Sequence, residues 1–288
     1  MIIIKLKGGL GNQLFQYTLG RSLEFVHHKQ VKFDLSWFDK FPQRKYNLSN
    51  FNTKVDIATK IEIIMLREWK MKKDGRRYFP LNLFRKKHAL HIEENYYHYQ
   101  DKILEVRNNT YLDGNWQSEK YFKNIENIIR KEITLKEKVN ENLKRNMQEI
   151  KECNSVSLHI RRGDYTTVKV QCILKLCSPE YYNQAIEFVK NKTKKPTFFI
   201  FSDDMEWVRN NIETHTPTIF VSDGNLKDYE ELILMSRCKH NIIANSSFSW
   251  WGAWLNDNQN KIVIAPKKWF KDTSKNTKDL IPESWIKL

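Results

Sequence analysis

The sequence predicts an α/β fold with parallel strands, organised in two halves of βα type. In the first half, the apolar run at 2–6 is followed by a glycine-rich turn at 8–12 and by helical periodicity at 14–26. In the second half, short apolar runs alternate with helical patterns from residue 151 onward, which is typical of a parallel sheet covered by helices. We therefore predict two domains, 1–150 and 151–288, with a small-molecule site in the cleft between them.

Length and composition agree with this division. The 288 residues are enough for two domains of ordinary size, and a hydrophobic content of 40% is enough to build their cores. The sequence has neither a run of roughly 18–20 apolar residues nor a signal-peptide pattern, so we expect a cytoplasmic protein. The four cysteines show no paired metal-binding spacing, which favours free thiols.

Basic residues dominate the charge and gather in one segment. The formal net charge is +15, and residues 60–90 contain ten basic residues against three acidic ones. Because apolar residues are interleaved with them, the segment suits peripheral contact with an anionic surface, here the inner face of the cytoplasmic membrane. A solvated basic face explains the same pattern. We expect no nucleic-acid partner, since we find no nucleic-acid-binding motif.

The glycine-rich turn admits two interpretations. It lacks the Gly-Lys-Ser/Thr of a P-loop, and Leu14 stands where the dinucleotide fingerprint has its third glycine. The turn therefore indicates either a ligand loop or a place where a helix packs closely on a strand. The remaining predicted elements of this half are a strand at 31–34, a helix near 56–72, a strand and helix start within 111–122, and two helices within 123–151.

A pair of arginines follows a strand at the start of the second half. Val156, Leu158 and Ile160 alternate with polar residues, the period of a half-buried strand. Arg161, Arg162 and Gly163 come next. Ligands bind just beyond the carboxyl ends of strands in open α/β sheets, and a guanidinium fits a phosphate bidentately. The pattern predicts an anion site, with a solvated surface turn as the alternative.

A second anion site is predicted near the end of the chain. A strand at 241–244 leads into Asn245, Ser246 and Ser247, and a helix runs from 248 to 255. A helix N-terminus offers backbone N–H groups and a partial positive charge, and serine hydroxyls add donors. A pyrophosphate can bind there without a metal. The three tryptophans of this helix are predicted to lie in the core.

Two adjacent acids, Asp203 and Asp204, follow a predicted strand at 197–201 and open a helix. Paired acids in such a place can bind a metal that holds a nucleotide diphosphate. The usual pattern for that role is Asp-x-Asp, whereas these two are adjacent. We therefore predict that one of them caps the helix and that no metal is bound.

Three motifs occur in order from residue 8 to residue 255. They read Gly8-Gly9-Leu10-Gly11-Asn12-Gln13-Leu14-Phe15-Gln16-Tyr17, then His159-Ile160-Arg161-Arg162-Gly163-Asp164-Tyr165, then Asn245-Ser246-Ser247-Phe248-Ser249-Trp250-Trp251-Gly252-Ala253-Trp254-Leu255. Together they resemble glycosyltransferase family 11, the α-1,2-fucosyltransferases. The resemblance covers nearly the whole chain, and it is specific to the family without identifying an acceptor.

The resemblance implies a GT-B-like fold, with two Rossmann-like domains facing a central cleft and GDP-fucose held by the C-terminal domain. It also implies that Asn12 and Gln13 border the transfer site and that the carboxylate of Glu231 accepts hydrogen bonds from guanine. A first-turn acid such as Glu231 also simply suits a helix dipole. The donor-binding residues are then Arg161, Arg162, Glu231, Asn245, Ser246, Ser247, Phe248, Asn12 and Gln13.

The implied reaction is an inverting transfer of L-fucose from GDP-β-L-fucose to the 2-hydroxyl of a galactose-terminated glycan. The acceptor would be a surface glycan such as an O-antigen or capsule unit, which can be lipid-linked. Arg161 and the helix end at Ser246 and Ser247 would stabilise the charge of the departing diphosphate, with no metal or other cofactor.

The general base is not assigned by the sequence. Asp164, His159 and Glu119 are the ionisable groups near the motifs, and Asp164 is the first candidate. Asp164 alternatively orients an arginine, and His159 alternatively is a core histidine. A non-catalytic protein that binds a GDP-sugar or a glycan is the alternative function.

Overall fold

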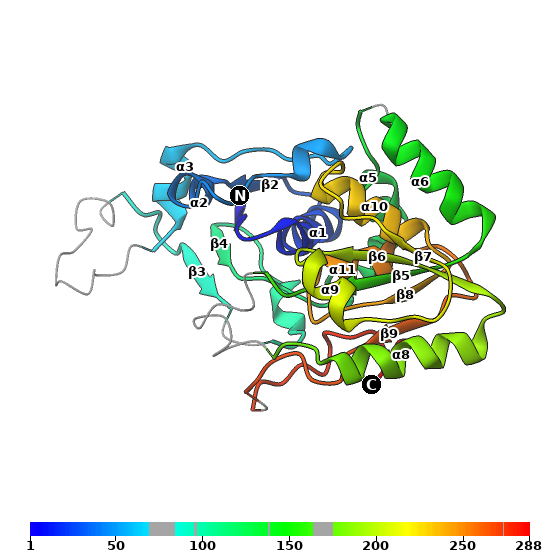
Figure 1. Cartoon of the computed structure of the whole chain (residues 1–288). Helices are drawn as coiled ribbons and strands as arrows, with labels where there is room; N and C mark the ends of the chain where they lie inside the picture. Colours follow the sequence, from blue (N-terminus) through cyan, green and yellow to red (C-terminus); the bar gives the residue numbers. More distant parts are fainter. Residues whose placement is uncertain (69–83, 95–96, 138, 164–174, 273) are drawn as a thin grey trace. The chain divides into compact units, whose positions relative to one another are not determined.

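The computed structural model describes residues 1–68, 84–94, 97–137, 139–163, 175–272 and 274–288. The chain forms two compact units (Figure 1). Unit 1 comprises Met1–Thr134 with Lys278–Leu280, and unit 2 comprises Leu135–Thr277 with Ile281–Leu288. The division therefore falls at residue 134 and not at 150. The reason is helix α6 (Glu141–Glu152), whose apolar face packs into the core of unit 2.

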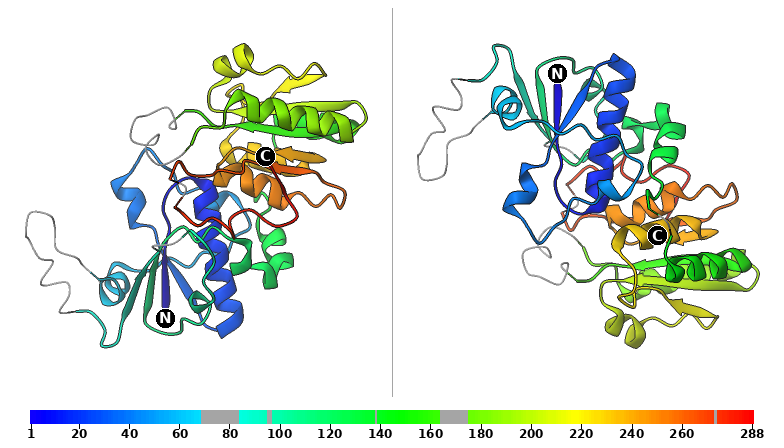
Figure 2. Two further views of the ribbon diagram at one scale, coloured as in Figure 1. Left: turned by 90° about the horizontal axis from the view of Figure 1, so that it is seen from below. Right: turned by 90° about the horizontal axis from the view of Figure 1, so that it is seen from above.

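Unit 1 contains a four-stranded parallel sheet of β1 (Ile2–Lys5), β2 (Val31–Asp34), β3 (Leu90–Glu93) and β4 (Thr110–Asp113) in the order β2-β1-β4-β3. Figure 2 shows helix α1 (Leu10–His27, blue) lying alongside β1. This approach is close because Gly20 has no Cβ, and one placed there would overlap Phe33. Helix α3 (Lys60–Leu66) covers the opposite face, where it packs against Ile3 and Tyr111.

Several short helices complete unit 1. Helix α3 begins at Thr59, whose hydroxyl accepts from Glu62 N while the Glu62 side chain accepts from Thr59 N, a capping box. The predicted helix near 56–72 is thus confirmed over 60–66, and its part beyond 68 lies outside the described residues. The other helices are α2 (Ser36–Lys40), α5 (Glu126–Glu132) and the 3-10 helices Leu48–Asn50, Asp101–Ile103, Glu119–Tyr121 and Lys123–Ile125.

Unit 2 contains a six-stranded parallel sheet covered on both faces. Its strands are β5 (Asn154–Ile160), β6 (Pro196–Ser202), β7 (Thr218–Phe220), β8 (His240–Ile242), β9 (Val263–Ala265) and β10 (Ile286–Lys287), in the order β10-β9-β8-β5-β6-β7. Its further helices are α8 (Pro179–Lys192), α9 (Met205–Asn211), α10 (Asp228–Arg237) and α11 (Ser247–Leu255). The predicted βα alternation is confirmed.

Strand β5 is buried on both faces, whereas its alternating pattern predicted a half-buried strand. Val156, Leu158 and Ile160 pack with α8 on one face. On the other face, Ser157 Oγ accepts from Asn241 Nδ2 at 2.7 Å, so polar partners take the place of solvent. The cause is the central position of β5 in the sheet, between β8 and β6.

The tryptophans of α11 lie in the core, as predicted. Trp250 and Trp251 are completely buried, and Trp254 is 4% exposed. Their rings contact one another, and Trp250 also contacts Trp285. This packing fixes helix α11 and therefore its N-terminus. Within the described part of the chain, no helix is long and apolar enough to cross a membrane.

Candidate functional site

The carboxyl edge of the unit 2 sheet brings most of the predicted donor-binding residues together. Ile160 at the end of β5 lies opposite Ser202 on β6, and Leu158 lies opposite Ile242 on β8. Because the strands are parallel, Arg161 leaves the sheet beside Asp203 on one side and near the turn that starts α11 on the other. This edge is where ligands bind in open α/β sheets.

Asp203 contacts the segment Arg161–Gly163 that follows β5, which we call the arginine turn. Its Oδ2 pairs with Arg161 Nη1 at 3.0 Å, and its Oδ1 accepts from the backbone N–H of Arg162 at 2.8 Å. Gly163 follows, and a Cβ at this position would overlap the Asp203 carboxylate. One carboxylate therefore fixes both the side chain of Arg161 and the path of the backbone after it.

Arg162 is bound to the start of helix α9. Its Nε lies 3.2 Å from Asp204 Oδ2, and its guanidinium stacks 3.9 Å from the centre of the Trp207 ring. Asp204 also caps α9 by accepting from Trp207 N at 3.1 Å, which confirms the predicted capping role of the acid pair. Among the described residues, no group of three or more His, Cys, Asp or Glu side chains could hold a metal ion.

His159 is a buried, neutral imidazole. It is 4% exposed, and burial, reinforced by the charge of Arg161, lowers its pKa to about 3. Its ring lies 5.6 Å from that of Phe248, and its Nδ1 has no hydrogen-bond partner in the described part of the chain. Such a weak base removes a proton poorly near neutral pH, so the geometry favours a positioning role over general-base catalysis.

The N-terminus of α11 points its first N–H groups to the same edge of the sheet. Ser246 is the N-cap, and its Oγ accepts from Phe248 N at 3.4 Å. Asn245 is 1% exposed, and its Nδ2 donates to Lys175 O at 2.6 Å and to Trp269 O at 2.8 Å. The side chain of Asn245 therefore stabilises the turn from inside.

Glu231 is a half-buried carboxyl group on α10. Burial raises its pKa to about 7; a hydrogen bond from Ser222 opposes this rise, and the neighbouring acids, Asp228 first among them, add to it. Glu230 has a different environment, since its carboxylate accepts from Asn140 Nδ2 at 2.5 Å and from Lys227 N at 2.8 Å. Glu230 is thus a structural acid, and Glu231 is an ionisable group without a cationic partner among these contacts.

In unit 1, Asn12 and Gln13 both lie inside α1, which begins at Leu10. Gln13 is completely buried, and its amide donates to Gly8 O at 3.0 Å and Lys45 O at 2.8 Å while accepting from Asn47 N at 2.9 Å. Its side chain therefore shapes the glycine turn, and its place at the border of the transfer site stays a prediction. Asn12 Oδ1 accepts from Gln117 Nε2 at 2.8 Å.

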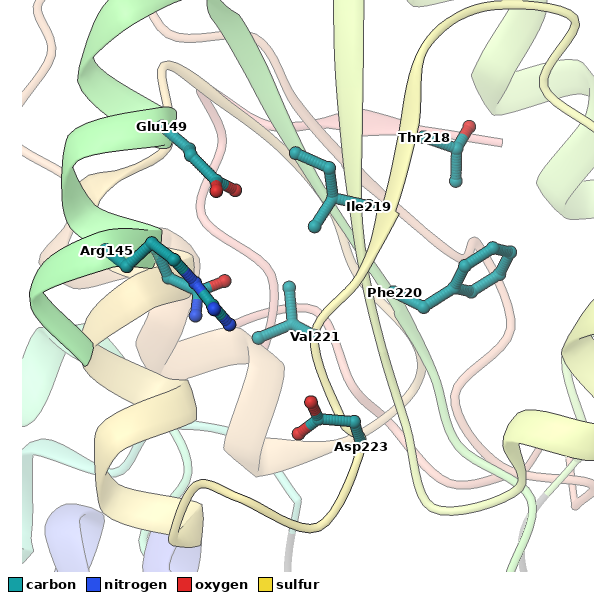
Figure 3. Close-up of a pocket in the computed structure, with 8 residues that line it drawn as sticks. Arg145, Glu149, Thr218, Ile219, Phe220, Val221 and Asp223 are labelled. Carbon is teal, nitrogen blue, oxygen red and sulfur yellow. The ribbon is translucent and has the colours of Figure 1, made fainter. Parts of the chain in front are cut away.

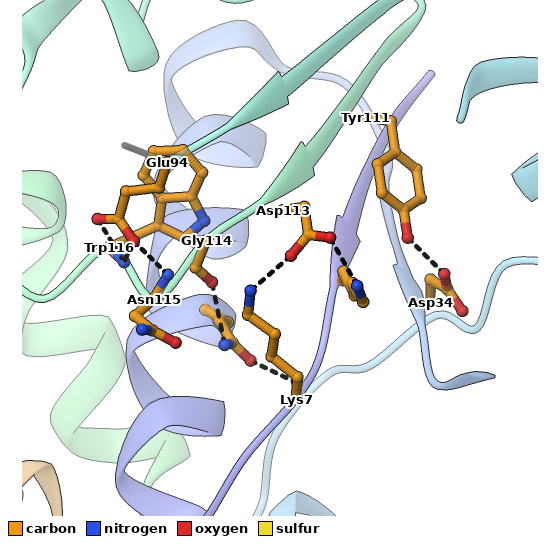
Figure 4. Close-up of polar contacts among 10 residues, drawn as sticks. Lys7, Asp34, Glu94, Tyr111, Asp113, Gly114, Asn115 and Trp116 are labelled. Carbon is orange, nitrogen blue, oxygen red and sulfur yellow. Dashed lines mark hydrogen bonds and ion pairs between the residues drawn. The ribbon is translucent and has the colours of Figure 1, made fainter. Parts of the chain in front are cut away.

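A polar network occupies the carboxyl edge of the unit 1 sheet (Figure 4). Lys5 and Lys7 each bind Asp113 at 2.6 Å, and these bonds hold its pKa below the usual range although burial opposes them. Glu94 accepts from the backbone N–H of Trp116 at 3.1 Å, and Trp116 has a left-handed φ of 56°. Trp116 is 2% exposed and is therefore a core residue of unit 1.

Two hollows in unit 2 lie apart from the predicted residues. One, of about 480 Å³, lies between α6 and the edge strand β7 (Figure 3). The other, of about 240 Å³, lies between the segment before α8 and the end of β9. None of the predicted site residues lines either hollow. The lining residues of the first are Arg145, Asn146, Glu149, Thr218, Ile219, Phe220, Val221 and Asp223.

Two sequence predictions lie outside the described residues. Asp164, the first candidate for the general base, falls in the segment 164–174, and much of the basic 60–90 stretch falls in 69–83. Conversely, the sequence did not single out Trp207 or Ser222, which contact Arg162 and Glu231. The sequence signal for Trp207 was its position three residues after Asp204, the acid that caps α9.

The fold is that of a two-unit α/β protein with parallel sheets, and comparison with known proteins identifies the chain as a glycosyltransferase. The family model "Glycosyl transferase family 11" matches residues 1–288, so the chain belongs to glycosyltransferase family 11. The sequence prediction of this family is confirmed.

Relatives and a solved structure agree with this assignment. The chain is 32% identical over 299 residues to an Escherichia coli protein named alpha-1,2-colitosyltransferase, covering 100% of this chain and 99% of the relative. It is 32% identical over 310 residues to the Escherichia coli O-antigen biosynthesis glycosyltransferase WbnK, covering 98% and 99%. A variant of Arabidopsis thaliana FUT1 in complex with GDP has a similar fold, with a TM-score of 0.52 and 10% identity over 99% of this chain and 75% of that chain. The predicted GT-B-like fold class is confirmed.

Proposed function

We propose that this glycosyltransferase moves L-fucose from GDP-β-L-fucose to the 2-hydroxyl of a terminal galactoside, with inversion at the anomeric carbon. Two relatives that match nearly the full chain carry names that support an α-1,2 linkage and a role in O-antigen synthesis. The acceptor we propose is accordingly a galactose-terminated unit of a bacterial surface glycan. The protein would act on it from the cytoplasmic side of the membrane.

The observation that carries this proposal is the pair of anion-binding elements at one sheet edge. Arg161 follows β5, and the N-terminus of α11 follows the neighbouring strand β8. As the bond between fucose and the diphosphate breaks, negative charge grows on the β-phosphate. A guanidinium and a helix N-terminus aimed at that charge lower the barrier without a divalent ion. We propose that the transfer needs no metal.

Glu231 is the group we propose for guanine recognition. A carboxylate can accept from the N1–H and the exocyclic amine of guanine, and hydrogen bonds to the ionised form stabilise it. Because the pKa of Glu231 is raised to about 7, binding of guanine would complete its ionisation. GDP binding near pH 6.5 should therefore release protons to the buffer.

The acceptor proton has to go to a base, and we keep Asp164 as the first candidate. The low pKa of His159 makes it the weaker choice. Asp164 stands three residues after Arg161 in the sequence, within the motif that resembles the family. Asp164→Asn should abolish transfer while leaving the affinity for GDP within about threefold of wild type.

Two alternatives remain open to the same experiment. A non-catalytic GDP-sugar-binding protein would bind GDP through these elements without turnover. A glycosyltransferase that uses GDP-colitose would share the site, a candidate favoured by the relative named alpha-1,2-colitosyltransferase.

The experiment mixes the protein with GDP-fucose or GDP-colitose and a panel of β-galactosides, and determines the linkage of any product by NMR. An α-1,2-fucosylated galactoside supports the proposal. A product formed only from GDP-colitose moves the donor assignment to that sugar. GDP binding without any product, across the whole panel, supports the binding-protein alternative.

A further inference from the structure

We propose that Asp203 is a positioning residue for sugar transfer, which acts by fixing the guanidinium of Arg161 toward the departing diphosphate. This inference rests on the proposed function, because it assigns a role to Arg161 in stabilising the leaving group. Asp203 belongs to the acid pair after β6, but it does not cap α9. The proposal gives Asp203 a role of its own.

The geometry separates the two acids of the pair. Asp204 caps α9 and binds Arg162 Nε. Asp203 makes neither contact, and its two oxygens instead bind Arg161 Nη1 at 3.0 Å and Arg162 N at 2.8 Å. The two adjacent acids thus stabilise different elements. Asp204 caps helix α9, and Asp203 binds the side chain of Arg161 and the backbone of Arg162.

The surroundings make Asp203 a rigid anchor. The strand register places it directly beside Arg161, because Ile160 and Ser202 are paired. Gly163 packs so closely on the carboxylate that no Cβ fits. The side chains of Arg161 and Asp203 are 23% and 25% exposed, so the pair is partly shielded from water while still reachable by a ligand. A partly shielded pair orients a guanidinium better than a fully solvated one.

The charge of Asp203 should weaken the affinity for a diphosphate, although its hydrogen bonds orient Arg161 for catalysis. A carboxylate next to Arg161 reduces the net positive charge that a diphosphate meets there. Asp203→Asn removes that charge and keeps the size of the side chain and one acceptor oxygen for Arg162 N. We therefore expect GDP to bind as tightly as to the wild type or more tightly, while catalysis suffers because Arg161 loses its fixed orientation.

The test measures the turnover number for transfer and the dissociation constant for GDP in the same variants. We expect Asp203→Asn to lower kcat by about ten- to a hundredfold, the size of effect that misplacement of a catalytic group produces. The GDP dissociation constant should stay equal or fall. Glu187→Gln, which removes an exposed carboxylate on α8 that pairs with Lys190, serves as the matched control and should change neither value.

A double-mutant cycle shows whether Asp203 acts through Arg161. In the Arg161→Ala background, Asp203→Asn should cause no further loss of kcat, since the group it positions is already gone. Multiplied losses in the double variant would contradict the proposal. So would a rise of the GDP dissociation constant in parallel with the fall of kcat, because that is the signature of a purely structural defect.

Failure of the proposed function would give a different result. If the wild type transfers neither fucose nor colitose to any acceptor, the proposed function is wrong. Measurements of GDP binding still test the contact between Asp203 and Arg161. If Asp203→Asn tightens GDP binding in the wild-type background but not in the Arg161→Ala background, the assignment that Asp203 acts through Arg161 is kept. Weaker binding in both backgrounds would overturn it.

Discussion

Arg161 and Arg162 are neighbours in the chain with different environments. Arg162 is fixed by Asp204 and by the face of Trp207, both of which belong to the start of α9. Arg161 is bound by Asp203 at the sheet edge. A planar guanidinium can stack and form a fork of hydrogen bonds, which a lysine ammonium cannot do. Arg162 therefore has a stacking partner and an ion-pair partner on α9, whereas Arg161, for which we propose contact with the diphosphate, pairs with Asp203.

Glu231 gives a prediction on pH dependence. Its pKa is raised to about 7 in the folded protein, whereas an unfolded glutamic acid ionises near 4.3. The folded state therefore holds a proton that the unfolded state releases between these values, so this group makes stability fall as pH rises from about 4.5 to 7. Glu231→Gln should raise the melting temperature relative to wild type at pH 8 and leave it equal near pH 4.5.

Melting curves of both proteins across this pH range provide the measurement. Glu230→Gln is the comparison, because Glu230 is bound by Asn140 and Lys227 and its replacement should destabilise the protein at both pH values. A gap between wild type and Glu231→Gln that does not change with pH would count against a raised pKa of Glu231.

At the scale of elements, the starts of helices α9 and α11 lie at the sheet edge that we predict to bind an anion. Helix α9 begins with a carboxylate that accepts a backbone hydrogen bond, and α11 begins with a serine that does the same. Helix α8 has Ser178 as its N-cap residue and Pro179 at its first position, and the Ser178 side chain accepts no capping hydrogen bond. Helices α9 and α11 thus have an N-terminal capping hydrogen bond that α8 lacks.

Removal of the α9 cap should cost stability. Asp204→Ala loses the bond to Trp207 N and the partner of Arg162 Nε, and loss of an N-cap typically costs about 1 kcal/mol. We expect a drop in melting temperature of several degrees. Ser178→Ala at the start of α8 is the matched control and should leave the melting temperature unchanged. Equal drops in both variants would mean that the capping bond of Asp204 contributes nothing.

The approach of α1 to the unit 1 sheet gives another test. A Cβ at Gly20 would lie 2.6 Å from the Phe33 ring, which itself contacts Tyr17. Overpacking of this kind costs about 1–3 kcal/mol, so Gly20→Ala should lower the midpoint of urea unfolding. Gly9→Ala, whose added Cβ would meet only Arg44 at 3.7 Å, should lower it much less. Similar midpoints for the two variants would argue against the close packing.

At the scale of the whole molecule, most of the order of strands and helices could be predicted from the sequence, because most elements show a strand or helix period, but β3, β10 and α2 were missed. The burial of Ser157 could not, because it depends on β5 lying in the middle of the sheet, whereas the alternative of a core histidine at His159 is confirmed. The structural roles of Gln13 and Asn245 were missed for a related reason. Their amide partners, Lys45 and Trp269, are distant in the sequence, so no local pattern reveals them.

The arginine turn and the serine turn were predicted as anion sites from local chemistry, and the parallel register places them at the same sheet edge. What local chemistry did not reveal is the carboxylate that accompanies each arginine. Asp203 and Asp204 stand about forty residues after the arginines in the sequence, and only the pairing of β5 with β6 brings them together.

The most direct test of metal-free fucosyl transfer is the rate of GDP release from GDP-fucose in excess chelator, with and without a β-galactoside acceptor. Wild type and Arg161→Ala are compared, with Arg209→Ala as control, because Arg209 stacks on Phe220 and is not one of the predicted site residues. We predict acceptor-dependent release that persists in chelator, falls by about a hundredfold or more in Arg161→Ala, and is unchanged in Arg209→Ala. Release that stops on chelation, or that survives loss of Arg161, would contradict the account.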